Sequence, residues 1–141
     1  MASRTYCFKF YLNSSHSLYD DNGHSHTWEL EIHINNKDDK YIVFTELENL
    51  TNKYISQFEG KYLNEYPPFD VIPPIMENMG DVFAYQLNDI LEKYDLSLKK
   101  LAISENPSRT YILDNDDKGY RNPLNPDIFE SLADHKVTLV R

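Results

Sequence analysis

The sequence predicts a single α+β domain in which two strands, two helices and two further strands follow one another. Three observations lead to this prediction: apolar residues alternate near the N-terminus, recur at helical spacing in the middle of the chain, and form two short segments after that. The length of 141 residues and the mass of 16.6 kDa fit one domain. We therefore expect one domain over residues 1–141, with residues 115–141 as a C-terminal extension.

The first two elements are predicted strands. Residues 5–15, TYCFKFYLNSS, are rich in aromatic residues and contain no strand breaker before Asn13. Residues 26–34, HTWELEIHI, alternate between apolar and polar side chains, so the apolar ones share one face. That face consists of Trp28, Leu30, Ile32 and Ile34.

Two helices are expected next. Thr45 followed by Glu48 matches a capping box, in which a hydroxyl and a carboxylate bond the free N–H groups of a helix start. A proline-bearing loop, residues 63–74, then separates two apolar stripes with helical spacing. These stripes are Leu47, Leu50, Tyr54 and Ile55, and, in a longer second helix, Met79, Phe83, Leu87, Ile90 and Leu91.

A final strand pair is predicted over residues 98–106 and 109–114, LKKLAISEN and RTYILD. The C-terminal extension is rich in turn-forming residues. Within it, residues 126–135 are compatible with a short helix and residues 136–140 with a short strand.

The composition excludes several classes of function. A formal charge of -9 and a pI near 4.9, without a cluster of basic residues, make nucleic acid an unexpected partner. No apolar run is long enough for a membrane span, and the N-terminal residues lack the apolar core of a signal peptide. The single cysteine excludes an internal disulfide. We therefore expect a soluble, cytoplasmic protein that does not bind membranes.

Three histidines gather at the start of the second predicted strand. His24 and His26 point to the same face as Trp28, whereas His33 points the other way. His16 ends the preceding strand, and the intervening loop can bring it close enough to be a third ligand. Three neutral imidazoles suit zinc and leave one coordination position open, as in catalytic sites. The alternative is that His16 caps a turn and the other two merely lie at a strand entrance.

Six motifs follow one another in order between residues 6 and 114. They are LNSSH, HSHTW, IVFTEL, YLNEYPPF, PPIMEN and ISENPSRTYIL. In this order they resemble the 6-pyruvoyl-tetrahydropterin synthase and 6-carboxy-tetrahydropterin synthase family. The resemblance implies that His16, His24 and His26 bind a zinc ion and that the substrate is a dihydropterin triphosphate. It also implies that Glu105 anchors the pterin ring, because a carboxylate can accept two parallel hydrogen bonds.

The resemblance further implies the tunnelling fold (T-fold), a four-stranded antiparallel sheet with two helices on one face. Proteins of this kind assemble into trimers that stack into hexamers, with active sites between subunits. Two features agree with a homo-oligomer: exposed sheet edges need to be covered, and eleven tyrosines with seven phenylalanines exceed what a small sheet readily hides. The alternative is a monomer whose C-terminal extension covers the edges.

The sequence departs from the family at the catalytic base. The family carries a cysteine shortly before its second histidine and an Asp-His pair ahead of the Leu-Asn loop. Here residues 17–23 contain no cysteine, and Glu59 and Gly60 occupy the positions of the pair. Nine extended residues between Cys7 and His16 correspond to about 30 Å, so this thiol is expected to lie far from the metal.

Two functions therefore compete. In the first, the protein is a zinc-dependent lyase or synthase in which Asp20, Asp21 or Glu59 replaces the cysteine as the base. In the second, it is a non-catalytic pterin- or zinc-binding member with lost or altered chemistry, and the two aspartates form an exposed acidic turn. Glu77 is expected to be structural, since an acidic residue in a helix's first turn stabilises the helix dipole. His24, His26 and Glu31 superficially match the His-x-His and downstream glutamate of a cupin, but this sequence lacks the glycines that flank the cupin motif and has too few strands.

Overall fold

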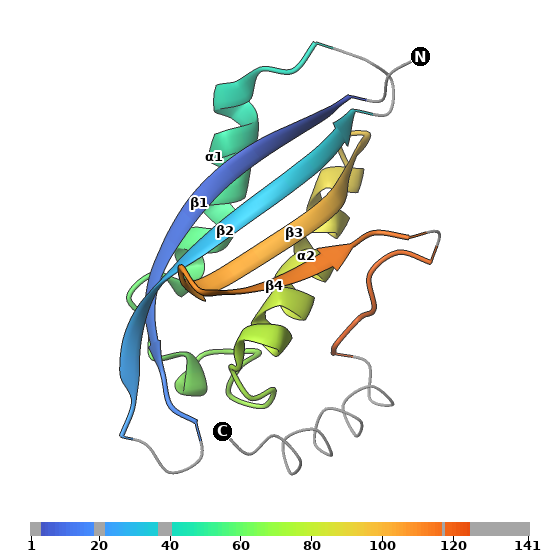
Figure 1. Ribbon diagram of the computed structural model, residues 1–141. Coiled ribbons are helices and arrows are strands. Elements are labelled where there is room, and N and C mark those ends of the chain that lie inside the picture. The colour runs from blue at the N-terminus through green and yellow to red at the C-terminus, as the bar shows by residue number, and fades with distance from the viewer. Residues whose placement is uncertain (1–3, 19–21, 37–40, 117, 125–141) are drawn as a thin grey trace.

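Four strands and two helices make up the fold in the predicted order. The computed structural model describes residues 4–18, 22–36, 41–116 and 118–124. The elements are β1 (Thr5–His16), β2 (His24–Asn36), α1 (Phe44–Ile55), α2 (Met76–Glu92), β3 (Leu96–Asn106) and β4 (Arg109–Asp114). The strands form one antiparallel sheet in the order β1-β2-β3-β4, and both helices cover the same face (Figure 1). The predicted α+β arrangement is confirmed. The helix and strand expected over residues 126–140 lie outside the described residues.

The pairing of β1 with β2 brings the three histidines to one face. Leu12 lies opposite Trp28, Ser14 opposite His26, and His16 opposite His24. Because alternate residues of a strand share a face, the three imidazoles lie on the side that carries the Trp28 ring. The pairing of β2 with β3 begins only at Glu29. The histidines therefore lie on a two-stranded part of the hairpin that extends beyond the rest of the sheet (Figure 1).

The core lies between the sheet and the helices. The predicted apolar face of β2 is confirmed, since none of its four side chains is exposed to solvent. The predicted stripe of α2 is buried at Met79, Phe83, Leu87 and Leu91, and partly buried at Ile90. Helix α2 packs tightly at Gly80, where a Cβ atom would come within 2.7 Å of the Tyr111 ring. The Tyr111 hydroxyl donates a hydrogen bond of 2.7 Å to Asp81, which ties β4 to the same helix turn.

The predicted capping box at Thr45 and Glu48 is wrong. Helix α1 begins at Phe44, with Val43 as the N-cap residue, and no side chain caps it. The Phe44 ring packs edge-on against two rings of β1, those of Tyr6 and Phe8. These contacts hold Phe44 against a distant strand as part of the first helical turn. Thr45 therefore lies inside the helix rather than at its cap.

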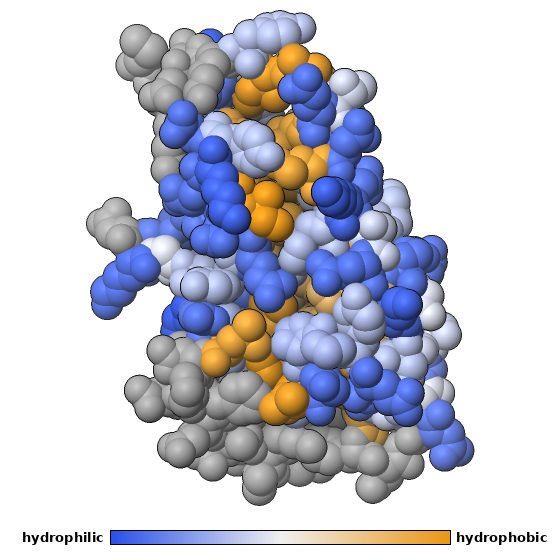
Figure 2. Space-filling model, turned by 180° about the vertical axis from the view of Figure 1, so that it is seen from behind, coloured by the Kyte–Doolittle hydropathy of each residue, from blue (hydrophilic) through white to orange (hydrophobic). Residues whose placement is uncertain are grey.

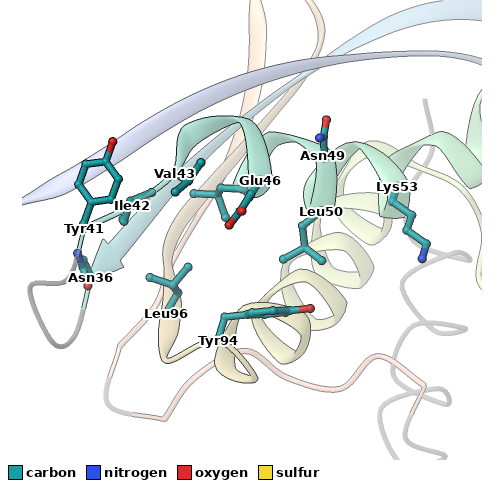
Figure 3. A pocket seen from close by; sticks show the side chains of 11 residues that line it. Asn36, Tyr41, Ile42, Val43, Glu46, Asn49, Leu50, Lys53, Tyr94 and Leu96 are labelled. Carbon is teal, nitrogen blue, oxygen red and sulfur yellow. The ribbon is translucent and has the colours of Figure 1, made fainter.

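The outer surfaces of the helices are mostly hydrophilic. Seen from the helix side, separate apolar patches interrupt this surface (Figure 2). A cavity of about 530 Å³ lies between the start of α1 and the residues that follow α2, with the Tyr94 side chain along it (Figure 3). Its lining includes Asn36, at the opposite end of β2 from His24. No helix in the described part of the chain is long and apolar enough to cross a membrane.

The two faces of β2 make different contributions to stability. Leu30→Ala deletes a fully buried side chain and is expected to lower the free energy of unfolding by about 2–5 kcal/mol. Glu29 points to the other face, where its ion pair with Lys9 is exposed, so Glu29→Ala should cost less than about 1 kcal/mol. Urea denaturation of both variants measures the difference. Equal losses would contradict the assignment of the faces.

Candidate metal centre

Three imidazoles converge at the end of the first hairpin. The potential ligand atoms of His16, His24 and His26 all lie within 4.8 Å of one another. The Nε2 atoms of His16 and His24 are 2.9 Å apart. Two nitrogens bound to a tetrahedral zinc at about 2.0 Å are roughly 3.3 Å apart. The rings therefore need only small shifts to hold such an ion, and the donor set fits a metal.

A backbone carbonyl fixes the orientation of His16. Its Nδ1 lies 2.7 Å from the Pro74 carbonyl oxygen, which can only accept a hydrogen bond, so Nδ1 carries the proton. The Nε2 lone pair is then directed toward His24. A hydrogen bond from one ring nitrogen to a carbonyl is a common device for setting the tautomer of a metal-binding histidine. The buried Asn78 of α2 supports the loop by donating a hydrogen bond of 2.9 Å to the Pro73 carbonyl.

Asn64 holds the backbone that follows His16. Its side-chain oxygen accepts a hydrogen bond of 2.8 Å from the Ser17 N–H, and its amide donates one of 3.1 Å to the Ser17 carbonyl. Asn64 belongs to a 3-10 turn, Leu63–Glu65, whose Leu63 side chain is fully buried. The Leu-Asn pair thus has a physical role: leucine anchors the turn in the core, and asparagine positions the chain beside a candidate ligand.

Burial favours the neutral form of two of the imidazoles. Loss of solvent contact lowers the pKa of His16 from its ordinary 6.5, while its hydrogen bond to Pro74 acts in the opposite direction. Burial likewise lowers the pKa of His26, against the opposing effect of the Glu105 carboxylate. Both rings are therefore mainly neutral near pH 7, and the neutral imidazole is the form that binds a metal.

Trp28 forms a rigid wall beside the imidazoles. The centre of its ring system lies 5.2 Å from that of His16 and 4.9 Å from that of His26, and the indole is fully buried. Among the described residues its Nε1 is a buried donor without a hydrogen-bond partner. Because Trp28 is the only tryptophan of the chain, its fluorescence can report on events at the three histidines.

Glu105 reaches the histidines from β3. It follows the buried Ile103 by two positions and lies where the pairing with β4 shifts register, since Ser104 pairs with Thr110 and Asn106 with Arg109. One carboxylate oxygen of Glu105 is 3.9 Å from Nε2 of His26, and the other is 3.4 Å from an Arg109 guanidinium nitrogen. The Glu105 side chain is only 16% exposed.

These groups line one cavity of about 260 Å³. Beside the three histidines and Glu105, its lining includes Arg109 and the first residues of α2, Met76 and Glu77. Three imidazoles that can hold a metal, a carboxylate and a guanidinium in one cavity can bind a polar molecule that carries anionic groups. Arg109 was not identified from the sequence. Its position four residues beyond Glu105, across a tight turn, does indicate that the two side chains can meet.

Of the three candidate bases only Glu59 is among the described residues, and it stands apart from this group. Glu59 accepts a hydrogen bond of 3.1 Å from the Asn13 N–H and does not line the histidine cavity. Asp20 and Asp21 lie outside the described residues. Cys7 lies on the opposite face of the sheet, beside His33, with which it is paired across the strands. No thiol from the described part of the chain lines the cavity.

Comparisons with known proteins identify the fold and the family. The family model described as 6-pyruvoyl tetrahydropterin synthase matches residues 5–116. The structure of Caenorhabditis elegans 6-pyruvoyl tetrahydropterin synthase is 14% identical, with a TM-score of 0.71 over 82% of this chain and 98% of that chain. The Plasmodium falciparum 6-pyruvoyl tetrahydropterin synthase is 17% identical, with a TM-score of 0.56 over 80% and 98%.

A Plasmodium vivax 6-pyruvoyltetrahydropterin synthase with its catalytic glutamate replaced by cysteine is also 17% identical, with a TM-score of 0.59 over 80% of this chain and 98% of that chain. No curated protein matches in sequence. At these identities the solved structures establish the fold, which is the tunnelling fold expected from the sequence. The family match covers most of the chain, from β1 to just beyond β4. The chain belongs to the 6-pyruvoyl tetrahydropterin synthase family.

Proposed function

We propose that the protein is a zinc-dependent synthase of the 6-pyruvoyl or 6-carboxy tetrahydropterin type, acting on a dihydropterin triphosphate. The observation that supports this most directly is the convergence of three imidazoles and the Glu105 carboxylate around one cavity. Membership of the family supports a pterin synthase-like function. Similar structures from C. elegans and P. falciparum are 6-pyruvoyl tetrahydropterin synthases.

In this proposal His16, His24 and His26 are the zinc ligands. When bound, zinc acts as a Lewis acid that stabilises negative charge on oxygens of the substrate side chain. The hydrogen bond from His16 to the Pro74 carbonyl keeps the Nε2 lone pair available to the ion. Glu105 accepts two hydrogen bonds from the pterin, one from a ring N–H and one from the exocyclic amine. Its contact with Arg109 leaves further lone pairs on both oxygens for this purpose.

A carboxylate is proposed as the catalytic base, with Asp20, Asp21 and Glu59 as the candidates. In two P. vivax structures the residue replaced is a catalytic glutamate, so a carboxylate has a catalytic role in that relative. Asp20 and Asp21 lie in the short segment that joins two proposed zinc ligands, within a few residues of each. A neighbouring carboxylate raises the pKa of its partner, which makes either aspartate a stronger base near neutral pH.

The second candidate is a pterin- or zinc-binding protein with lost or altered chemistry. Two observations on the described residues favour it. No cysteine lines the cavity, and the Glu59 carboxylate is engaged by the Asn13 backbone. Turnover of the substrate, measured separately from its binding, distinguishes the two functions.

The first prediction concerns the metal. It is made in a Cys7→Ser background, so that the only thiol of the chain cannot contribute to binding. His16→Ala or His26→Ala should abolish most zinc binding, because each removes one of three convergent ligands. His33→Ala should retain it, since His33 lies on the other face. Elemental analysis and a zinc titration followed by Trp28 fluorescence measure the effect. Equal loss in all three variants would contradict the proposed ligand set.

The second prediction concerns assembly. We propose a homo-oligomer, a trimer or a hexamer, because within the described residues β1 and β4 each have only one neighbouring strand. Exposed strand edges are usually paired or covered. Light scattering coupled to size exclusion should give a mass several times 16.6 kDa at micromolar concentration. A monomer mass would refute an assembled ring.

The third prediction concerns catalysis. Turnover of a dihydropterin triphosphate should rise with pH as the catalytic carboxylate loses its proton, since only the ionised form is a base. Of the variants Asp20→Asn, Asp21→Asn and Glu59→Gln, one should lower turnover by about 10²- to 10⁴-fold while zinc content stays constant. Glu105→Ala should instead weaken substrate binding. Substrate binding without turnover in the unmodified protein would favour the second candidate function.

A further inference from the structure

A second group of metal-binding side chains lies on the sheet face opposite the candidate metal centre. Cys7 of β1 pairs directly with His33 of β2, and Glu31 precedes His33 by two positions on the same face. The thiol sulfur, a carboxylate oxygen and a ring nitrogen of these residues all lie within 4.8 Å of one another. Glu31 Oε1 is 2.7 Å from His33 Nε2.

This group cannot share an ion with the first one. His33 is seven residues from His26 along β2, which corresponds to roughly 23 Å in an extended strand. The odd spacing also directs the two side chains to opposite faces of the sheet. The two groups therefore form separate centres with separate ligands.

The donor set is characteristic of a borderline transition metal. Cysteine sulfur, imidazole nitrogen and carboxylate oxygen are the three ligand types that bind zinc in proteins. Magnesium and calcium prefer oxygen ligands alone, so they do not suit a thiol-bearing group. The side chains of Glu31 and His33 are 33% and 24% exposed, and Cys7 is exposed. Solvent can thus supply a fourth ligand.

The electrostatics around the thiol agree with a cation. Burial and the Glu31 carboxylate raise the pKa of Cys7, so without a metal the thiol stays protonated. The hydrogen bond with His33 lowers the pKa of Glu31, which keeps the carboxylate charged. A divalent cation reverses the situation of the thiol, since it binds the thiolate and the carboxylate together. Lys9 and Lys100 lower the pKa of Cys7 only as lesser effects.

We propose that Cys7, Glu31 and His33 form a second metal site, which binds zinc or another borderline divalent ion through sulfur, oxygen and nitrogen. The proposal does not depend on the proposed synthase activity, because none of its ligands lines the histidine cavity. It assigns the single cysteine of the chain a role as a metal ligand on the open face of the sheet.

Cobalt(II) is the probe for this site. A cobalt–thiolate bond gives a charge-transfer absorption in the near ultraviolet that imidazole ligands do not give, and Cys7 is the only possible source of it. Titration of the metal-free, full-length protein should produce this band and one more equivalent of bound cobalt than in Cys7→Ser. The band should persist in the His16→Ala/His26→Ala double variant, which separates this site from the proposed zinc centre.

Variants of the other two ligands complete the test. Glu31→Gln and His33→Ala should each weaken cobalt binding at this site by at least the roughly 10-fold that loss of an outer-shell partner costs, because each removes a coordinating group. Lys9→Gln is the matched control, because Lys9 neighbours Cys7 on the same face without being a ligand, and it should retain the band. The absence of the band in the unmodified protein would overturn the proposal. So would a band that is unchanged in both ligand variants, or one whose intensity per chain rises with protein concentration, which indicates a thiol bridging two chains.

Discussion

The pairing of His16 with His24 across the first hairpin is the constraint on which the candidate metal centre depends. A shift of this register by one residue would send every side chain of one strand to the other face. The register is fixed farther along the hairpin, where Leu12 pairs with Trp28 and both side chains are fully buried. The hydrophobic core therefore determines where the imidazoles meet, although it lies beside them rather than around them.

Three separate segments then hold the imidazoles in place. The turn that carries Asn64 fixes the backbone after His16, and the Pro73–Pro74 loop supplies the carbonyl that orients its ring. The register shift between β3 and β4 occurs at Glu105, whose carboxylate lies near His26. These supports come from parts of the chain that are far apart in sequence. This explains why the recognisable motifs are spread from β1 to β4 rather than gathered in one stretch.

Side-chain alternation made much of this arrangement predictable. The sequence alone indicated that His24, His26 and Trp28 share a face and that His33 points away, because these relations depend only on strand periodicity. Contacts between distant segments could not be predicted in the same way. The capping-box pattern at Thr45 failed because Phe44 packs on β1, and local propensity contains no information on that contact. The pairing of Cys7 with His33 was missed for the same reason, since it requires the register between two strands. From the sequence alone, only the separation between Cys7 and His16 along the first strand could be estimated.

Strand β2 has different roles in its two-stranded part and in the rest of the sheet. From Glu29 onward β2 is held between two neighbours and its apolar side chains maintain the core, whereas its first residues carry histidines and pair only with β1. Residues 17–18 and 22–23, the described ends of the segment that joins the two strands, contribute no side chain to the hydrophobic core. Such an architecture lets evolution replace one reactive group with another in this segment without rebuilding the domain. A lineage can in this way keep its three histidines while the chemistry beside them diverges.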